Sequence, residues 1–151
     1  MVEDHLIELT NEIHGHVGIY SILGVKMGLR AVEAYQAAGG APSLISVVSY
    51  AGSLPPVSCF SDGLQISTGA TLGRGRIRVS QEGGARPEAE FHCEGMVLRL
   101  RLKPEYLEKI QDYIRTGTEQ YGRTPQYWSY IQDIAMRIWK EWDREVLFES
   151  L

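Results

Sequence analysis

Apolar residues in the first quarter of the chain recur with helical spacing. They predict a short helix over about residues 3–12 and a second helix over residues 17–38. In the second helix apolar side chains surround most of the circumference, a pattern typical of a buried central helix. Gly24 and Gly28 lie one turn apart within it. Because glycine has no Cβ, this spacing predicts that another backbone approaches closely there.

The pattern then changes to the alternation that is typical of strands. Residues 44–50 are rich in β-branched side chains and predict the first strand, and a short helix is expected to follow from Ser58 as its N-cap. Because Glu94–Gly95 indicates a hairpin turn, the later strands are expected to follow one another as an antiparallel meander. Those three strands are predicted over residues 76–80, 88–93 and 96–102.

After Lys103 the apolar residues return to helical spacing. Pro104 begins one helix, which is expected to end at Gly117. Thr124 and Pro125 form an N-cap and first-turn pair that opens a long C-terminal helix over residues 124–148, which carries all three tryptophans. Its aromatic stripe is compatible with core packing in its own domain. Such a helix can also outrun the core of a small domain, in which case its apolar face predicts a homodimer.

Helices at both ends of a run of strands predict an α+β fold, with an antiparallel or mixed sheet packed against helices and a long C-terminal helix. The length of 151 residues fits a single domain over residues 1–151. The formal net charge of −4 argues against a nucleic-acid or anionic-membrane partner. With two cysteines and no apolar stretch long enough to cross a bilayer, a cytoplasmic protein without a membrane segment is expected.

His14 and His16 flank a single glycine immediately before the buried helix. Residues two apart do not share a helical face, so joint metal coordination needs the backbone freedom that Gly15 supplies. The alternative is that the pair forms a helix-capping turn. His-x-His alone is a weak metal motif.

Cys59, Asp62 and Gln65 follow at three-residue steps and therefore lie along one side of the short helix. A thiol in the first helical turn is near the positive end of the helix dipole, which favours the reactive thiolate. The alternative is a buried structural cysteine beside a capping aspartate. If this helix meets the two histidines, then two imidazoles and one thiolate form the ligand set of an open zinc site, where Asp62 binds or orients a water.

Residues 68–75 form a glycine-rich stretch whose backbone N–H groups, together with Arg74 and Arg76, could bind an anion. Neither a Walker motif nor a dinucleotide-binding glycine fingerprint is present. The alternative is that the arginines lie on the solvated face of a sheet.

Two segments together resemble the E-subunit family of formylmethanofuran dehydrogenase. Its members carry His-Gly-His-x-Cys-Pro and, later, Cys-x-x-Asp-x-x-Gln-x-x-Thr-Gly-x-Thr-x-Gly. The segments here are His14-Gly-His16 and Cys59-Phe-Ser-Asp62-Gly-Leu-Gln65-Ile-Ser-Thr68-Gly69-Ala-Thr71-Leu-Gly73-Arg74-Gly75. The resemblance covers most of residues 1 to about 150. It implies an α+β core domain with a metal-binding cleft, for zinc or another divalent transition metal. Residues matching His14, His16 and Cys59 would line that cleft, with Asp62, Gln65, Thr68 and Thr71 nearby.

This sequence departs from the family pattern at two points. Gly18 and Ile19 replace the Cys-Pro of the first motif, which removes a thiol that could bind metal. No cysteine follows Cys93 in this sequence, so we expect a core domain without the cysteine-rich zinc ribbon that many members carry after it.

The resulting hypothesis is a metal-binding protein of one-carbon or redox metabolism. His14, His16 and Cys59 would hold the metal, Cys59 and Asp62 would act in any catalysis, and Arg74 would hold a small anionic ligand. Whether the protein is an enzyme stays open. The alternative is a non-catalytic accessory subunit that docks on a molybdenum or tungsten redox-enzyme complex through its C-terminal helix.

Overall fold

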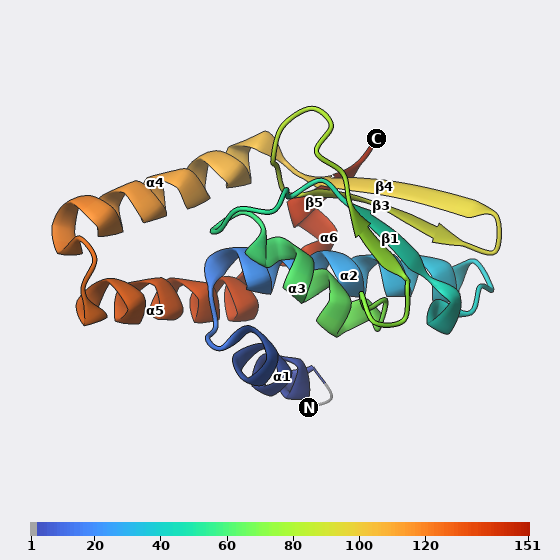
Figure 1. The fold of residues 1–151 in the computed structure, drawn as a ribbon, viewed down its shortest axis with the longest axis horizontal. Coiled ribbons are helices and arrows are strands. Elements are labelled where there is room, and N and C mark those ends of the chain that lie inside the picture. The colour runs from blue at the N-terminus through green and yellow to red at the C-terminus, as the bar shows by residue number, and fades with distance from the viewer. Residues whose placement is uncertain (1–2) are drawn as a thin grey trace.

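A computed structural model describes residues 3–151 and shows a five-stranded mixed sheet with helices packed against it (Figure 1). The predicted α+β class is confirmed. None of the helices in residues 3–151 is both long and apolar enough to cross a membrane. The elements are α1 Asp4–His14, α2 Ile19–Ala37, the 3₁₀ turn η1 Pro42–Leu44, β1 Ser46–Ser49, α3 Cys59–Thr68, β2 Ile77–Val79, β3 Glu88–Cys93, β4 Met96–Leu102, α4 Pro104–Tyr121, α5 Pro125–Glu141, α6 Arg144–Leu147 and β5 Phe148–Ser150.

The strands lie in the order β2-β1-β3-β4-β5, with only β1 and β2 parallel. The predicted β3–β4 hairpin is confirmed, and Glu94 and Gly95 make its turn with positive φ. The predicted meander is wrong at its first step, because β1 inserts between β2 and β3. Val47 and Val48 of β1 are buried, whereas Val79 of β2 is 42% exposed, so the more apolar strand takes the inner position.

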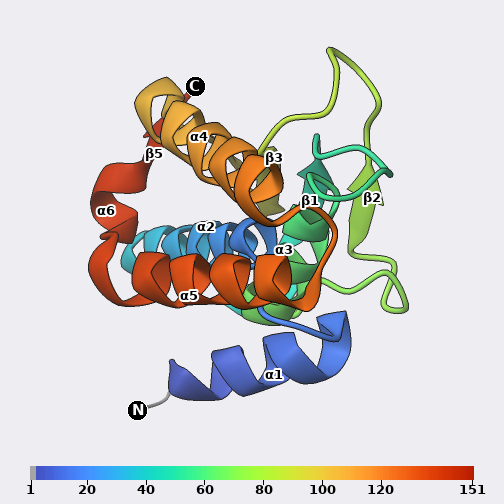
Figure 2. The same ribbon diagram turned by 90° about the vertical axis from the view of Figure 1, so that its left-hand side faces the viewer.

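The core centres on α2, which lies between the sheet and its neighbouring helices and packs most extensively on α3 (Figure 2). The predicted close approach of another backbone is confirmed at Gly24, where a Cβ would lie 2.1 Å from the carbonyl oxygen of Phe60. Gly63 of α3 makes the reciprocal approach, where a Cβ would lie 2.0 Å from the carbonyl oxygen of Ser21. Side chains at either position would force the two helices apart. At Gly28 the closest neighbour is instead the Ser67 side chain, whose Oγ would lie 1.9 Å from a Cβ.

Helix α4 does not end at Gly117 as expected but runs on to Tyr121. Gly117 is buried beneath α5, and a Cβ there would lie 2.5 Å from Cε1 of Tyr130. The glycine therefore serves helix packing and not chain termination. Helices α4 and α5 form a hairpin that projects away from the sheet (Figure 1).

A long helix near the C-terminus is confirmed, and the Thr124 hydroxyl caps it by accepting a hydrogen bond from Tyr127 N. The predicted extension to residue 148 is wrong, because α5 ends at Glu141 and the short α6 and the edge strand β5 follow. Lys26 of α2 donates its Nζ hydrogens to the carbonyl oxygens of Trp139 and Trp142, at 3.0 and 2.6 Å. These bonds satisfy carbonyl groups that the helix end leaves without a partner, and the chain then turns back to the sheet.

Buried Glu88 links two arginines on the face of the sheet that points away from α2. Its carboxylate accepts hydrogen bonds from Nε of Arg86 at 3.0 Å and Nε of Arg99 at 2.8 Å. The Tyr50 ring lies between these two guanidinium groups, at 4.7 and 4.5 Å. Burial alone would raise the pKa of Glu88, but the hydrogen bonds and charges of Arg86 and Arg99 lower it below its usual value.

Substituting Glu88→Gln is expected to lower the free energy of unfolding by about 1–2 kcal/mol at pH 7, because two part-exposed arginines lose a buried carboxylate. A lowered folded-state pKa stabilises the fold above the ordinary carboxyl pKa of about 4.3, and this stabilisation is lost as the pH falls below it. Urea unfolding at pH 7 and at about pH 3 should therefore show the gap between wild type and variant closing at low pH. An equal gap at both pH values would contradict this account.

The control for this prediction is Glu149→Gln, which removes the partner of Arg101 at the sheet edge. Both side chains of that pair are substantially exposed, so the expected loss is below about 0.5 kcal/mol.

Candidate functional site

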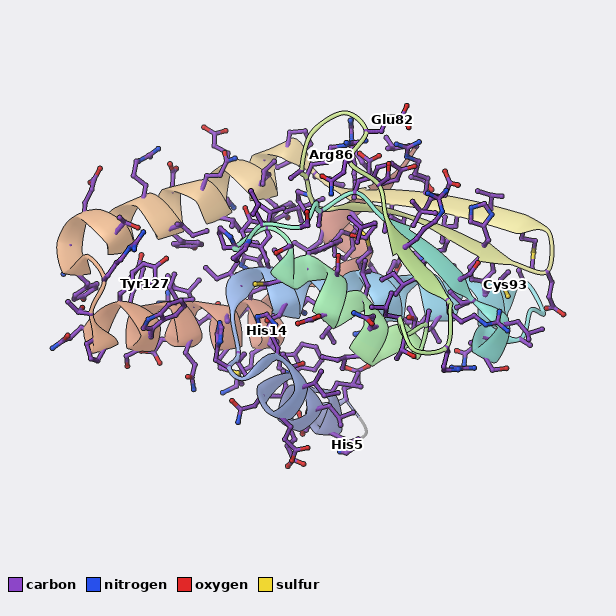
Figure 3. All side chains as sticks on the ribbon, in the orientation of Figure 1. His5, His14, Glu82, Arg86, Cys93 and Tyr127 are labelled. Atoms are coloured by element: carbon purple, nitrogen blue, oxygen red, sulfur yellow. The ribbon has the colours of Figure 1, made fainter. Side chains whose placement is uncertain are left out.

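His14 and His16 lie at the junction between α1 and α2. His14 is the last residue of α1, and Gly15 ends the helix in the left-handed conformation with φ of 89°. This turn brings the two imidazole rings together, with their centroids 4.8 Å apart. Figure 3 shows His14 beside the start of α2, close to α3 and α5. The left-handed backbone at Gly15, which the sequence led us to expect, therefore places both rings at one pocket.

The His14 ring is fixed by Asp62 of α3. Nδ1 of His14 lies 2.5 Å from Oδ2 of Asp62, and the histidine side chain is only 10% exposed. Because a carboxylate can only accept, Nδ1 carries the shared hydrogen in this contact. The other ring nitrogen, Nε2, is buried and has no hydrogen-bond partner among residues 3–151. An imidazole held in this way by a carboxylate, with its second nitrogen unpaired, is the usual arrangement of a histidine that binds a metal.

Cys59 is the first residue of α3 and lines the same small pocket as the two histidines, with a volume of about 60 Å³. Ser58 occupies the N-cap position as predicted, but its side chain makes no capping bond. Burial, and after it the negative charge of Asp62, raises the pKa of the Cys59 thiol. In the free protein, desolvation therefore acts against the thiolate and outweighs the helix dipole.

His16 packs edge-on against Trp128 of α5, with ring centroids 5.2 Å apart. Burial, and then the neighbouring His14, lowers the pKa of His16, so its ring is neutral at pH 7. The rings of His16 and Trp128 also border an adjoining hollow of about 220 Å³, whose other lining residues are Val17 and Gln132. Trp128 is 55% exposed, and the sequence places it only in the apolar stripe of the C-terminal helix. The only feature of the sequence that points to Trp128 is the concentration of tryptophans in that helix.

The remaining walls of the pocket are apolar or aromatic, and no lysine or arginine lines it. Over residues 3–151, no three His, Cys, Asp or Glu side chains are close enough together to hold a metal ion. The structure thus brings His14, His16 and Cys59 to one pocket without converging them on a single point. The apolar and aromatic residues that line the rest of the pocket are Gly18, Ile19, Tyr20, Pro56, Ile114, Tyr127, Trp128 and Ile131.

The polar residues at the other end of α3 build the turn that follows it. Gln65 is 3.5 Å from Asp62 and also accepts a hydrogen bond from the Leu72 backbone. Thr68 accepts from Ala70 N, and Thr71 accepts from Arg74 N. Gln65 therefore contacts Asp62, the partner of His14, but neither Gln65 nor the two threonines line the pocket.

The two arginines of the glycine-rich stretch are engaged with backbone carbonyl groups. Arg74 is exposed and donates to the carbonyl oxygen of Gly69 at 2.7 Å, and Arg76 donates to that of Leu44. Neither lines the pocket of His14 and Cys59. The structure therefore does not bring Arg74 to the predicted metal ligands.

Cys93 and His92 lie away from this pocket, as Figure 3 shows for Cys93. Cys93 is 1% exposed and donates its thiol hydrogen to the carbonyl oxygen of Ala41, so it lies in the core. His92 is half-buried on the opposite face of the sheet, 2.6 Å from Glu90.

The match to a known family covers most of the chain. A family model described as "FmdE, Molybdenum formylmethanofuran dehydrogenase operon" matches residues 13–149. The match begins immediately before His14 and includes Cys59, Asp62 and the turn after α3. No curated protein gives a significant match.

Proposed function

Because the chain belongs to the FmdE family, we propose that it binds one divalent transition metal, best fitted by zinc, in a role related to formylmethanofuran dehydrogenase. The observation that carries the proposal is the buried and unpaired Nε2 of His14, whose ring Asp62 holds from the other side. An unpaired buried polar atom is costly, and a metal ion would satisfy it.

His16 and Cys59 would complete the ligand set, because both line the pocket that contains His14. Imidazole nitrogen and thiolate sulfur favour zinc over magnesium or calcium, which prefer oxygen. Binding requires the His16 ring and the Cys59 side chain to turn toward Nε2 of His14. It also requires Cys59 to release its proton, so affinity should rise with pH.

Because glycine has no side chain that could bind a metal, Gly18 leaves His14, His16 and Cys59 as the ligands that the chain itself supplies. A Cβ on Gly18 would lie 3.4 Å from Nε2 of His16, so a cysteine here, as in the family motif, would reach the same pocket. Its replacement by glycine leaves room beside His16 for a water or a ligand atom. An open position of this kind is typical of catalytic and not of structural zinc sites.

When bound, the metal would supply Lewis-acid polarisation of a carbonyl or similar group. Asp62 would keep the hydrogen on Nδ1 of His14 and stabilise positive charge on that ring. Tyr127, Ile131 and Trp128 would exclude water and contact the ligand. Because no lysine or arginine lines this pocket, the metal itself would have to bind any charged group of a ligand, and the aromatic and aliphatic walls would contact its uncharged part.

Cobalt(II) titration tests the proposal, because a cobalt–thiolate bond gives a near-ultraviolet charge-transfer band. Wild type should bind about one equivalent of cobalt and show this band. Cys59→Ser should lose the band, whereas Cys93→Ser, which changes the other cysteine, should keep it. A band that survives in Cys59→Ser, or no cobalt binding by folded wild type, would overturn the proposed ligand set.

A further inference from the structure

A cavity of about 710 Å³ lies between α1 and the segment that joins α5 to α6. Helix α1 packs on α3 and α2, and it lies below α5 in the view of Figure 2. The cavity shares no lining residue with the His14 pocket. Its walls include Ile7, Met136, Trp139 and Trp142, and Lys26 of α2 contributes the amine.

The hydrogen bonds of Lys26 match a neutral amine. The residue is only 4% exposed, and Nζ donates to the carbonyl oxygens of Trp139 and Trp142. Those two acceptors satisfy the two hydrogens of an uncharged amine and leave its lone pair free, whereas an ammonium group has a third hydrogen to place. Over residues 3–151, no carboxylate forms a salt bridge with Nζ; the nearest aromatic contact is the Trp139 ring at 5.2 Å.

Arg144 engages two of the carboxylates near Lys26. The carboxylates of Glu3 and Glu33 bind Arg144 at 2.8 and 2.5 Å, so neither is left to pair with Lys26. Burial, and after it the positive charge of Arg144, lowers the pKa of Lys26 to about 8 against the opposing effect of Glu3 and Asp143. About half of the Lys26 amines are therefore neutral at pH 8, against well under about 1% for an ordinary lysine of pKa about 10.4.

We propose that Lys26 is a nucleophilic amine that forms an imine with an uncharged aldehyde bound in this cavity. The four apolar wall residues suit an apolar aldehyde body. The other wall residues are five acidic and three basic side chains, and this excess of negative charge disfavours an anionic aldehyde. Capping the end of α5 explains the two hydrogen bonds of Lys26, but it explains neither the adjoining cavity nor the missing carboxylate partner.

The reaction balances without a further reagent. The Nζ lone pair adds to the carbonyl carbon, and a proton moves from nitrogen to oxygen to give a carbinolamine. Loss of the hydroxyl group with the second amine hydrogen then gives the C=N bond and one water. That water can donate to the carbonyl groups of Trp139 and Trp142, which lose their amine hydrogens in the reaction.

Reductive trapping with benzaldehyde and cyanoborohydride tests the proposal on the full folded chain. Peptide mapping would follow the four lysines separately: Lys26, Lys103, Lys109 and Lys140. At pH 8 Lys26 should be benzylated at least about tenfold faster than each of the others, since its neutral fraction is about a hundredfold larger. Lys140 is the internal control, because it is exposed yet lines the same cavity.

Two further measurements separate the outcomes. In Lys26→Met the fast phase should vanish while Lys103, Lys109 and Lys140 react at unchanged rates. Glyoxylate, which is anionic, should label Lys26 more slowly than benzaldehyde does. Labelling of Lys26 no faster than of Lys140, or only after unfolding, would overturn the nucleophile, and equal labelling by glyoxylate would overturn the assigned ligand class.

Discussion

Substituting Gly63→Ala is expected to destabilise the protein by more than about 3 kcal/mol, or to prevent folding. The new Cβ would lie 2.0 Å from the carbonyl oxygen of Ser21 and 2.6 Å from the backbone nitrogen of Val25. Both atoms belong to the backbone of α2, the most buried helix, so no side-chain rotation can relieve the clash. Separating α3 from α2 would also move Asp62 away from His14.

Urea denaturation of wild type and Gly63→Ala measures this effect. The matched control is Gly73→Ala in the turn after α3, where an added Cβ meets nothing within 4 Å. That variant should unfold within about 0.5 kcal/mol of wild type. A Gly63→Ala protein with a near-wild-type midpoint would show that the α2–α3 contact is looser than described.

Two substitutions in the His14–Asp62 pair should separate the metal ligand from its support. His14→Ala is expected to remove high-affinity zinc binding, because it deletes the one donor atom that is already buried and unpaired. Asp62→Asn should weaken zinc binding about 10–100-fold, because the amide can still accept from Nδ1 but brings no negative charge. Competition with a chromophoric chelator gives both affinities.

The control for this pair is Glu90→Gln, which alters the other close histidine–carboxylate contact, between Glu90 and His92 on β3. Zinc affinity should stay within about twofold of wild type there, because His92 faces away from the pocket and lies in no cluster of donors. If Asp62→Asn and Glu90→Gln bind zinc equally well, Asp62 has no part in the site.

The local pattern of the chain predicts most elements but not all of their neighbours. Alternation identifies residues 76–80 as a strand, yet it carries no information on which strand pairs with it, and β1 takes the place next to β3. Gly117 is expected from the sequence to end a helix, whereas its burial beneath Tyr130 is a tertiary contact. The end of α5 likewise depends on Lys26, which is more than a hundred residues away along the chain.

The candidate site is predictable in its residue types more than in its connections. The sequence singles out His14, His16 and Cys59, and the fold does bring them to one pocket. Asp62 is expected from the sequence to handle a water, but it bonds the His14 ring across 48 residues of sequence. Trp128 could not be assigned to the site, because an aromatic stripe on a helix is as compatible with core packing.

The metal content of protein purified without chelator or histidine tag tests the central claim most directly. Elemental analysis should find about one transition metal per chain in wild type and none in a folded His14→Ala, Cys59→Ser double variant, with circular dichroism confirming the fold of both. No metal in folded wild type, even after addition of zinc and dialysis, or equal metal in the double variant, would contradict the proposed site.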